Sequence, residues 1–243
     1  ALPIYILKEV NTPDVKIITV EDPIEYQLSG VIQTQIDNDT GYTFASAMRS
    51  LLRQNPNIMM IGEIRDNETA KIALEAASTG HLVLSTIHTN SAAGAVSRFM
   101  GLDIERQMLA NTLECSIGQR LVRKLCPHCE KEEVVLSPEN INQIKEILAG
   151  IKNKDFVMPK EFKFYRSKGC AKCNNIGYQG LLGLYEVLEM NPAIQTAIIN
   201  KNISDQELEK IAVKNGMITI IQDGILKALA GLTSIEEIFR VAK

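Results

Sequence analysis

The sequence predicts an α/β fold: a mostly parallel sheet flanked by helices, with a tetracysteine zinc-binding insertion and a C-terminal helical bundle. In the first half of the chain, strand-length apolar runs alternate with helical segments. Parallel strands need long crossover connections, which are usually helices, so this alternation favours a parallel sheet. Two CxxC pairs lie beyond it, and two capping boxes near the end of the chain predict short helices.

Three short apolar runs predict the strands, and each run ends in polar residues. The first is rich in β-branched residues and stops before a proline, which cannot continue a buried strand. The predicted strands span residues 16–20, 58–61 and 81–87, and the polar residues that follow them are Glu21 and Asp22, Glu63, and His88. Ligands of parallel sheets bind beyond the carboxyl ends of the strands, so we expect these four side chains to converge there.

Helices are predicted between these strands. Thr43 is an expected N-cap of a helix with apolar residues at helical spacing. The same spacing places Arg49 and Arg53, four residues apart, together on its exposed face. Asp66 is the expected N-cap of a second helix over residues 68–79.

The remaining elements are predicted from shorter patterns. Residues 26–28 and 31–36 alternate polar and apolar side chains, which indicates a small exposed hairpin. Residues 91–100 and 104–125 predict two helices, the second with Cys115 on a buried apolar face. The elements expected after these are a helix beginning at Ser137-Pro138, a possible strand at 182–188, and three C-terminal helices, two of them opened at Ser204 and Thr233.

Composition excludes several classes of function. The 243 residues include 26 Lys plus Arg and 29 Asp plus Glu, a net charge of -3 at pH 7. There is no basic stripe with interleaved aromatic residues, so direct nucleic-acid binding is not expected. No apolar run approaches the roughly 18 to 20 residues that cross a bilayer, so no membrane span is expected. Four of the five cysteines form two CxxC pairs, a pattern that indicates a metal site in a reducing compartment and favours the cytoplasm.

The two CxxC pairs, Cys126 with Cys129 and Cys170 with Cys173, offer four thiolates to a tetrahedral ion, for which zinc fits best. Four cysteines leave no open coordination position, so we expect a structural site. A helix that leaves and returns between the pairs would bring them together. The competing interpretation, a redox CxxC, needs a single pair beside a thioredoxin-like unit. His128 is expected to be a bystander.

Three motifs, taken in order, resemble those of the type II secretion and type IV pilus assembly ATPases. Residues 18–25 resemble the aspartate box, residues 61–66 the atypical Walker B motif, and residues 79–90 the histidine box. The resemblance continues through the CxxC pairs and the segment Gly183-Leu184-Tyr185-Glu186-Val187-Leu188, so it covers essentially the whole chain. The tetracysteine segment is more similar to the assembly and secretion branch than to the retraction motors.

The resemblance implies a RecA-like domain that forms a homo-hexameric ring and hydrolyses ATP between subunits with the help of Mg²⁺. It implies that Glu63 orients the attacking water or the water molecules around the magnesium ion. It also implies that Glu21 and Asp22 share metal binding and general-base catalysis. It also implies that His81 and His88 sense the γ-phosphate.

Three arginines have implied roles at the nucleotide or the subunit boundary. Arg49 and Arg53 match charge-compensating arginines of the family, and Arg65 lies within the Walker B-like motif. A solvated helix face is the alternative for Arg49 and Arg53. The implied partner is an inner-membrane platform protein, which would hold the motor at the cytoplasmic side of the membrane and let it move pilin-like subunits.

The sequence also departs from the family pattern. No phosphate-binding loop of the form G-x-x-x-x-G-K-[ST] precedes the aspartate box, and residues 5–10 resemble the helix that follows such a loop. We therefore expect a fragment that begins just after this loop and lacks the platform-docking domain, so that alone it binds ATP weakly and does not hydrolyse it. Residues 55–57 read Asn-Pro-Asn where the family usually has acids. The expected parts are a RecA-like core at 1–125, a zinc-binding subdomain at 126–180 and a helical subdomain at 181–243.

Two further functions stay open at this stage. One is a zinc-stabilised, nucleotide-incompetent subunit that joins or regulates an active ring. The other is a small metal-dependent hydrolase using Glu63, Asp22 and His88, although the sequence has no compact metal motif such as HExxH. Protein secretion, pilus assembly and DNA uptake all use similar motors, so the motifs do not distinguish among them.

Overall fold

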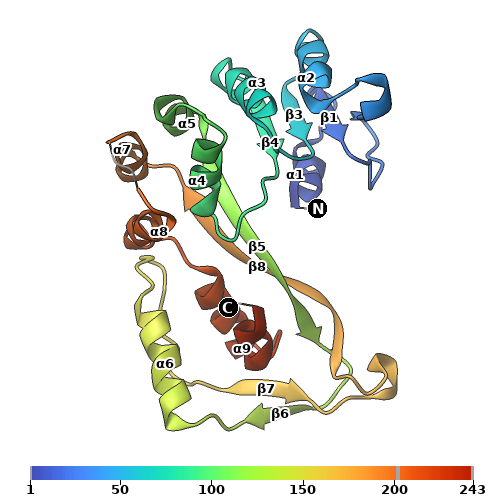
Figure 1. Cartoon of the computed structure of the whole chain (residues 1–243). Coiled ribbons are helices and arrows are strands. Elements are labelled where there is room, and N and C mark those ends of the chain that lie inside the picture. The colour runs from blue at the N-terminus through green and yellow to red at the C-terminus, as the bar shows by residue number, and fades with distance from the viewer. Residues whose placement is uncertain (1, 201–202, 242–243) are drawn as a thin grey trace. The chain divides into compact units, whose positions relative to one another are not determined.

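The structure, a computed structural model, describes residues 2–200 and 203–241. They form two compact units: the first contains a four-stranded sheet and the second contains two two-stranded sheets (Figure 1). Each unit has its own hydrophobic core. The first unit contains residues 2–89, 94–114 and 195–200, and the second contains residues 90–93, 115–194 and 203–241. Among the described helices, none is both long and apolar enough to cross a membrane.

A four-stranded parallel sheet organises the first unit. Its strands are β1 (Ile17–Glu21), β2 (Val31–Gln35), β3 (Ile58–Ile61) and β4 (Leu82–Ser85), in the order β2-β1-β3-β4. Every residue of β1 and β3 is buried, as expected where helices cover both faces of a parallel sheet. The three predicted strands and the predicted α/β class are therefore confirmed.

Helices precede, connect or follow these strands (Figure 1). They are α1 (Leu2–Val10), η1 (Asn38–Thr40, a 3-10 turn), α2 (Phe44–Leu52), α3 (Asn67–Ser78), α4 (Gly94–Gly101) and α5 (Arg106–Thr112). Both predicted N-caps are present: Thr43 and Ser46 form a reciprocal capping box, and Asp66 accepts the Thr69 N–H at 2.8 Å. Leu7 of α1 is fully buried in a cluster with strand residues, so α1 contributes to the core beside the sheet.

Two antiparallel strand pairs form the frame of the second unit. The long pair is β5 (Cys115–Leu125) with β8 (Tyr178–Glu189), and the short pair is β6 (Lys131–Val134) with β7 (Phe164–Ser167). Its helical elements are α6 (Pro138–Ala149), η2 (Ala171–Cys173, a 3-10 turn), α8 (Asp205–Lys214), α9 (Ile220–Leu229) and α10 (Ile235–Val241). The helix α7 (Pro192–Asn200) begins in this unit, and its residues 195–200 belong to the first unit. Phe164, Leu184 and Ile225 are fully buried at the centre of its core. The predicted helix at Ser137-Pro138 and the capping box at Ser204 are confirmed.

Three predictions of secondary structure were wrong. Residues 115–125 form a strand, not part of a helix, because they pair along their length with β8, and the spacing of Ile117, Leu121 and Leu125 only imitates a helical stripe. Cys115 is accordingly exposed on β5. Residues 31–35 do not pair with 26–28 but run parallel to β1, and four described helices, not three, follow β8.

A buried carboxylate ties the last helix to β5. Glu237 of α10 is only 2% exposed, and its oxygens accept hydrogen bonds from the Arg123 main-chain N–H at 2.9 Å and side chain at 2.6 Å. Arg240 donates from Nε at 2.9 Å and from Nη2 at 2.8 Å. These bonds, first those from Arg240 and then those from Arg123, outweigh burial and hold the pKa of Glu237 well below its usual range.

We predict that Glu237→Gln lowers the free energy of unfolding at pH 7 by about 1–3 kcal/mol, because charge-assisted bonds are lost while the shape is kept. The folded-state pKa of Glu237 lies below the value of about 4.3 in an unfolded chain, so its stabilisation is complete above that pH and is lost as pH falls. Thermal unfolding across a pH series should therefore show the gap between wild type and variant closing in acid. Glu236→Gln, at the exposed neighbouring position, is the control. A gap that stays constant with pH would contradict the prediction.

Candidate functional site

The ends of three strands fix the backbone just before Glu63. Gly62 follows β3; its N–H donates to Val20 O of β1 at 2.7 Å, and its carbonyl accepts Thr86 Oγ1, beyond β4, at 2.6 Å. A Cβ atom at residue 62 would lie 3.3 Å from Val20 O, which is tighter than ordinary van der Waals contact. Glycine thus lets β1 and β3 approach closely where Glu63 leaves the sheet.

Glu63 lies between an imidazole and a guanidinium. Its Oε2 is 3.2 Å from His88 Nε2, and its Oε1 is 2.6 Å from Arg65 Nη2. The Glu63 side chain is 12% exposed, whereas those of His88 and Arg65 are 85% and 66% exposed. The hydrogen bond and charge of Glu63, with a smaller contribution from Asp22, raise the pKa of Arg65. A shielded carboxylate beside an exposed imidazole can orient water or take up a proton at the sheet edge.

The two acids that follow β1 have different surroundings. Glu21 is 4% exposed, and its Oε1 accepts Thr19 Oγ1 at 2.6 Å and Gln33 Nε2 at 2.8 Å. These bonds hold the Glu21 carboxylate within the sheet, between β1 and β2. Asp22 is exposed and, together with Arg65, lines a cavity of about 280 Å³. Asp22 is therefore the acid of this pair that faces open space.

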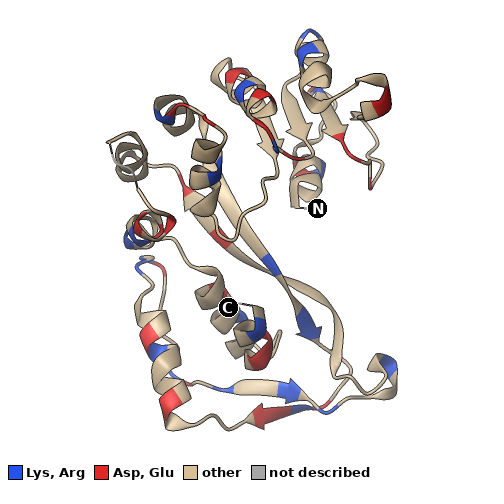
Figure 2. Ribbon diagram, in the orientation of Figure 1, with Lys and Arg blue, Asp and Glu red and all other residues tan. Residues whose placement is uncertain are grey.

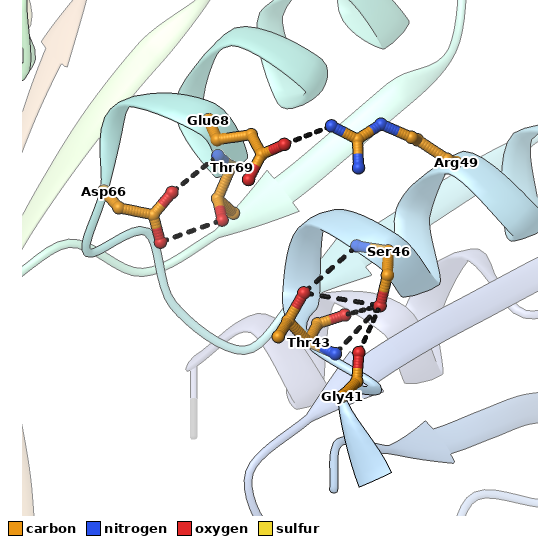
Figure 3. Close-up of polar contacts among 7 residues, drawn as sticks. All are labelled: Gly41, Thr43, Ser46, Arg49, Asp66, Glu68 and Thr69. Atoms are coloured by element: carbon orange, nitrogen blue, oxygen red, sulfur yellow. Dashed lines mark hydrogen bonds and ion pairs between the residues drawn. The ribbon is translucent and has the colours of Figure 1, made fainter. Parts of the chain in front are cut away.

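The same cavity is bordered by the first turns of α2 and α3. Thr43 and Asp66, which cap these helices, both line it, as does Glu68. Figure 3 shows the two caps and the ion pair between Glu68 and Arg49, which joins α3 to α2. The cavity thus combines carboxylates, a hydroxyl and the Arg65 guanidinium, a lining suited to a polar ligand.

The other predicted site residues lie elsewhere. Arg49 pairs with Glu68 and is thereby directed toward α3, and Arg53 is exposed just beyond the end of α2. His81 precedes β4, at the opposite end of the strand from His88, and its Nδ1 lies 3.0 Å from Ala76 O. The structure therefore brings Glu63, His88 and Arg65 together, with Asp22 beside Arg65, and separates His81 from them.

Sequence reasoning missed the residues that hold this edge in place. Thr19 and Gln33 bind the Glu21 carboxylate, and Thr86 binds the Gly62 carbonyl. Their only sequence signal is a polar side chain inside or just after an apolar strand. A polar side chain that is buried in a strand, as Thr19 is, needs a hydrogen-bond partner, and a neighbouring acid can supply it.

The four cysteines of the CxxC pairs meet at one point, all four sulfurs within 4.8 Å of one another. The Sγ separations are 4.0 Å for Cys126 and Cys170, 3.5 Å for Cys129 and Cys173, and 3.8 Å for Cys170 and Cys173. An ion with tetrahedral bonds of about 2.3 Å to sulfur separates its ligands by about 3.8 Å. The geometry therefore fits a zinc ion. Within the described part of the chain, no other group of three or more Cys, His, Asp or Glu side chains gathers in this way.

Main-chain donors prepare this site for thiolates. The N–H groups of Cys170 and Gly177 each donate to Cys173 Sγ at 3.3 Å. Burial alone would raise the pKa of Cys173, but these donors and the neighbouring thiols lower it to about 6. Burial and the surrounding sulfurs raise the pKa of Cys129 to about 12. A bound cation would favour the deprotonated form of all four.

The two pairs of antiparallel strands bring the two CxxC pairs together. Leu125 of β5 pairs with Tyr178 of β8, and Lys131 of β6 pairs with Ser167 of β7, so each CxxC lies between the two pairs. The helix α6 leaves after β6 and returns to β7, as predicted (Figure 1). Acidic residues of β6 face basic residues at β7, including Arg166 with Glu132 at 3.1 Å (Figure 2). The tetracysteine group therefore lies where the two strand pairs of the second unit meet.

Comparisons with known proteins agree with this arrangement. A family model described as "Type II/IV secretion system protein" matches residues 4–240. The type IV pilus assembly ATPase PilB of Thermus thermophilus is 43% identical over 233 residues, which are 96% of this chain and 25% of that protein. The type II secretion system ATPase E of Vibrio cholerae is 41% identical over 237 residues, 98% of this chain and 44% of that protein. The chain thus spans less than half the length of these relatives.

Solved structures show the same fold. The crystal structure of the pilus retraction motor PilT with bound ADP has a TM-score of 0.66 at 27% identity, covering 98% of this chain and 56% of that one. The Legionella pneumophila ATPase DotB has a TM-score of 0.64 at 20% identity, a likeness of fold alone, covering 99% of this chain and 56% of that one. Since the family model covers all but a few terminal residues, the chain belongs to the type II secretion and type IV pilus assembly ATPase family.

Proposed function

We propose that this chain is the catalytic part of a motor that hydrolyses ATP to drive type II protein secretion or type IV pilus assembly. The observation that carries the proposal is the position of Glu63, held between His88 and Arg65 at the carboxyl edge of a parallel sheet. Nucleotides bind at this edge in open α/β sheets. The family membership gives the reaction class.

The roles follow from exposure and contacts. Glu63, shielded but reachable, orients the attacking water, and His88 senses the γ-phosphate through its contact with Glu63. Glu21, fixed by two hydrogen bonds, keeps the end of β1 in place. A magnesium ion bound with ATP supplies charge neutralisation, and the carboxylates of Asp22 and Glu63 have the hard oxygen donors that would hold it.

One edge of the four-stranded sheet is open for a further strand, and such a strand could lead into the phosphate-binding loop that the sequence lacks. β4 is at the edge of the four-stranded sheet, and its Leu82 is 44% exposed. Apolar edge strands of parallel sheets are normally covered. We infer that a segment upstream of α1 in the gene adds a strand here and supplies the loop that grips the phosphates.

We also propose that the motor is a homo-hexamer that acts on a membrane partner. Six copies would form a ring with ATP at the subunit boundaries, where Arg49 and Arg53, both on exposed surface, would face developing phosphate charge. An inner-membrane platform protein on the cytoplasmic side would receive the motion. A zinc ion held by the four cysteines would stabilise the second unit without taking part in the chemistry.

A comparison of two proteins tests the function. The complete gene product, read from its start codon, should hydrolyse ATP in a magnesium-dependent way, whereas the 243-residue chain should bind a fluorescent ATP analogue weakly and turn over none. The reason is that most phosphate contacts come from the loop. Micromolar binding with turnover by the 243-residue chain would refute the dependence on an upstream loop. A complete product without ATPase activity would favour the alternative of a regulatory subunit.

A further inference from the structure

Glu186 is a buried acid that the site described above does not use. It lies in β8, within the segment Gly183–Leu188, and is 6% exposed. Its Oε1 accepts the Ala92 N–H at 2.6 Å, and its Oε2 accepts the Ile220 N–H at 3.3 Å. The carboxylate is therefore held by main-chain donors, which bind an ionised acceptor strongly.

A glycine on the neighbouring strand leaves space for the Glu186 side chain. Gly118 of β5 pairs with Glu186 in the antiparallel register. A Cβ atom at residue 118 would lie 2.7 Å from Glu186 Cγ and 2.8 Å from its Oε1, closer than real Cβ atoms come. Any larger residue at position 118 would displace the carboxylate. The glycine and the glutamate thus form a matched pair across the strands.

The segment that Glu186 holds directly follows His88 in the chain. Residues 90–93 belong to the second unit, and two side chains of the β5–β8 pair bind them. Glu186 binds the Ala92 N–H, and Arg120 Nη2 donates to Asn90 O at 2.8 Å. Only Thr89 separates His88 from this anchored segment.

We propose that Glu186 and Arg120 are positioning residues for His88. They hold the main chain at Ala92 and Asn90, just after the histidine, and thereby restrict the positions that the imidazole can take beside Glu63. The segment is short, so a shift of the anchored backbone moves the histidine with it. This inference rests on the proposed ATPase function.

The isosteric substitution Glu186→Gln tests the proposal in the complete gene product. The amide keeps the volume but turns one acceptor into a donor, so one of the two main-chain N–H groups loses its partner. We expect kcat for ATP hydrolysis to fall about 10- to 100-fold, because small displacements of a catalytic group cost rates of this order. KM for ATP should stay the same, since the phosphates are bound elsewhere. Glu189→Gln, the same change at an exposed position of β8, is the control and should leave kcat unchanged.

A double-variant cycle separates positioning from a general loss of structure. If Glu186 acts through His88, adding Glu186→Gln to His88→Ala should cause no further loss of kcat, whereas a structural defect would multiply the two losses. Multiplied losses, or a Glu186→Gln variant with wild-type kcat, would overturn the proposal. If Glu186→Gln does not fold, the same cycle with Arg120→Gln decides. An inactive wild-type product would instead refute the proposed function itself.

Discussion

Replacing Cys126 with serine should abolish metal binding and destabilise the second unit strongly. Cys126 is fully buried, and its sulfur lies 4.0 Å from that of Cys170 at the junction of the two strand pairs. Structural zinc supplies on the order of 10 kcal/mol to the folding of small zinc domains. That is comparable to the whole stability of a typical domain, about 5–15 kcal/mol. The core around Phe164 and Leu184 would keep part of the unit folded, but the strands next to the CxxC pairs would no longer be linked by a metal ion.

Metal analysis and thermal unfolding together measure this effect. Wild-type protein purified under reducing conditions should contain about one zinc per chain, and a strong chelator should lower its unfolding midpoint. Cys126→Ser should contain no zinc and become sensitive to protease near residues 126–134 and 164–177. Cys115→Ser is the matched control, since Cys115 is an exposed thiol on β5 outside the metal group. Wild-type protein without zinc, or a Cys126→Ser variant with full zinc content and an unchanged midpoint, would disprove a structural zinc site.

Elements with strong local signals were predictable from the sequence. The caps at Thr43 and Asp66 and the runs at 17–20 and 58–61 were found because capping and burial are encoded within a few residues. The convergence of Glu63 and His88 followed from a rule of topology, since parallel strands share one carboxyl edge. The cysteine group followed from ligand spacing.

Elements that depend on distant partners were not predictable in the same way. The strand β5 exists because residues 178–189 pair with it, and a helical spacing of apolar residues hid that pairing. The polar residues of β2 looked solvent-facing, but Gln33 accepts the Leu28 N–H at 2.6 Å and donates to Glu21 at 2.8 Å. Tertiary contacts outweighed local pattern in both places.

The same limit applies to the site. Glu21 and Asp22 are neighbours in sequence, yet in the folded chain the Glu21 carboxylate is held within the sheet and Asp22 lines a cavity. His81 and His88 were grouped by their motif, although they stand at opposite ends of β4. Glu186 was part of a motif with no role assigned to the residue itself, and the role proposed for it depends on its hydrogen bond to Ala92, which is distant in sequence.

Glu63→Gln should nearly abolish ATP hydrolysis by the complete gene product while leaving ATP binding intact. The amide keeps the size of the side chain but removes the negative charge that faces His88 at 3.2 Å and Arg65 at 2.6 Å. A neutral group orients and activates water poorly, and losses of general-base catalysis are typically about 10²- to 10⁴-fold. We therefore expect kcat to fall by that factor and the Kd for ATP to change less than about threefold, because the proposed upstream loop would make most of the contacts to the phosphates.

Single-turnover hydrolysis and equilibrium binding of a fluorescent ATP analogue measure the two quantities separately. Glu75→Gln is the matched control, because Glu75 is an exposed acid on α3 of the same unit and its loss should leave both quantities at wild-type values. If Glu63→Gln weakened binding as much as it slowed hydrolysis, Glu63 would serve mainly to hold the nucleotide or its metal. If it hydrolysed ATP at the wild-type rate, the reacting water would have to be oriented by another residue, such as Asp22, an exposed acid that lines the cavity at this edge.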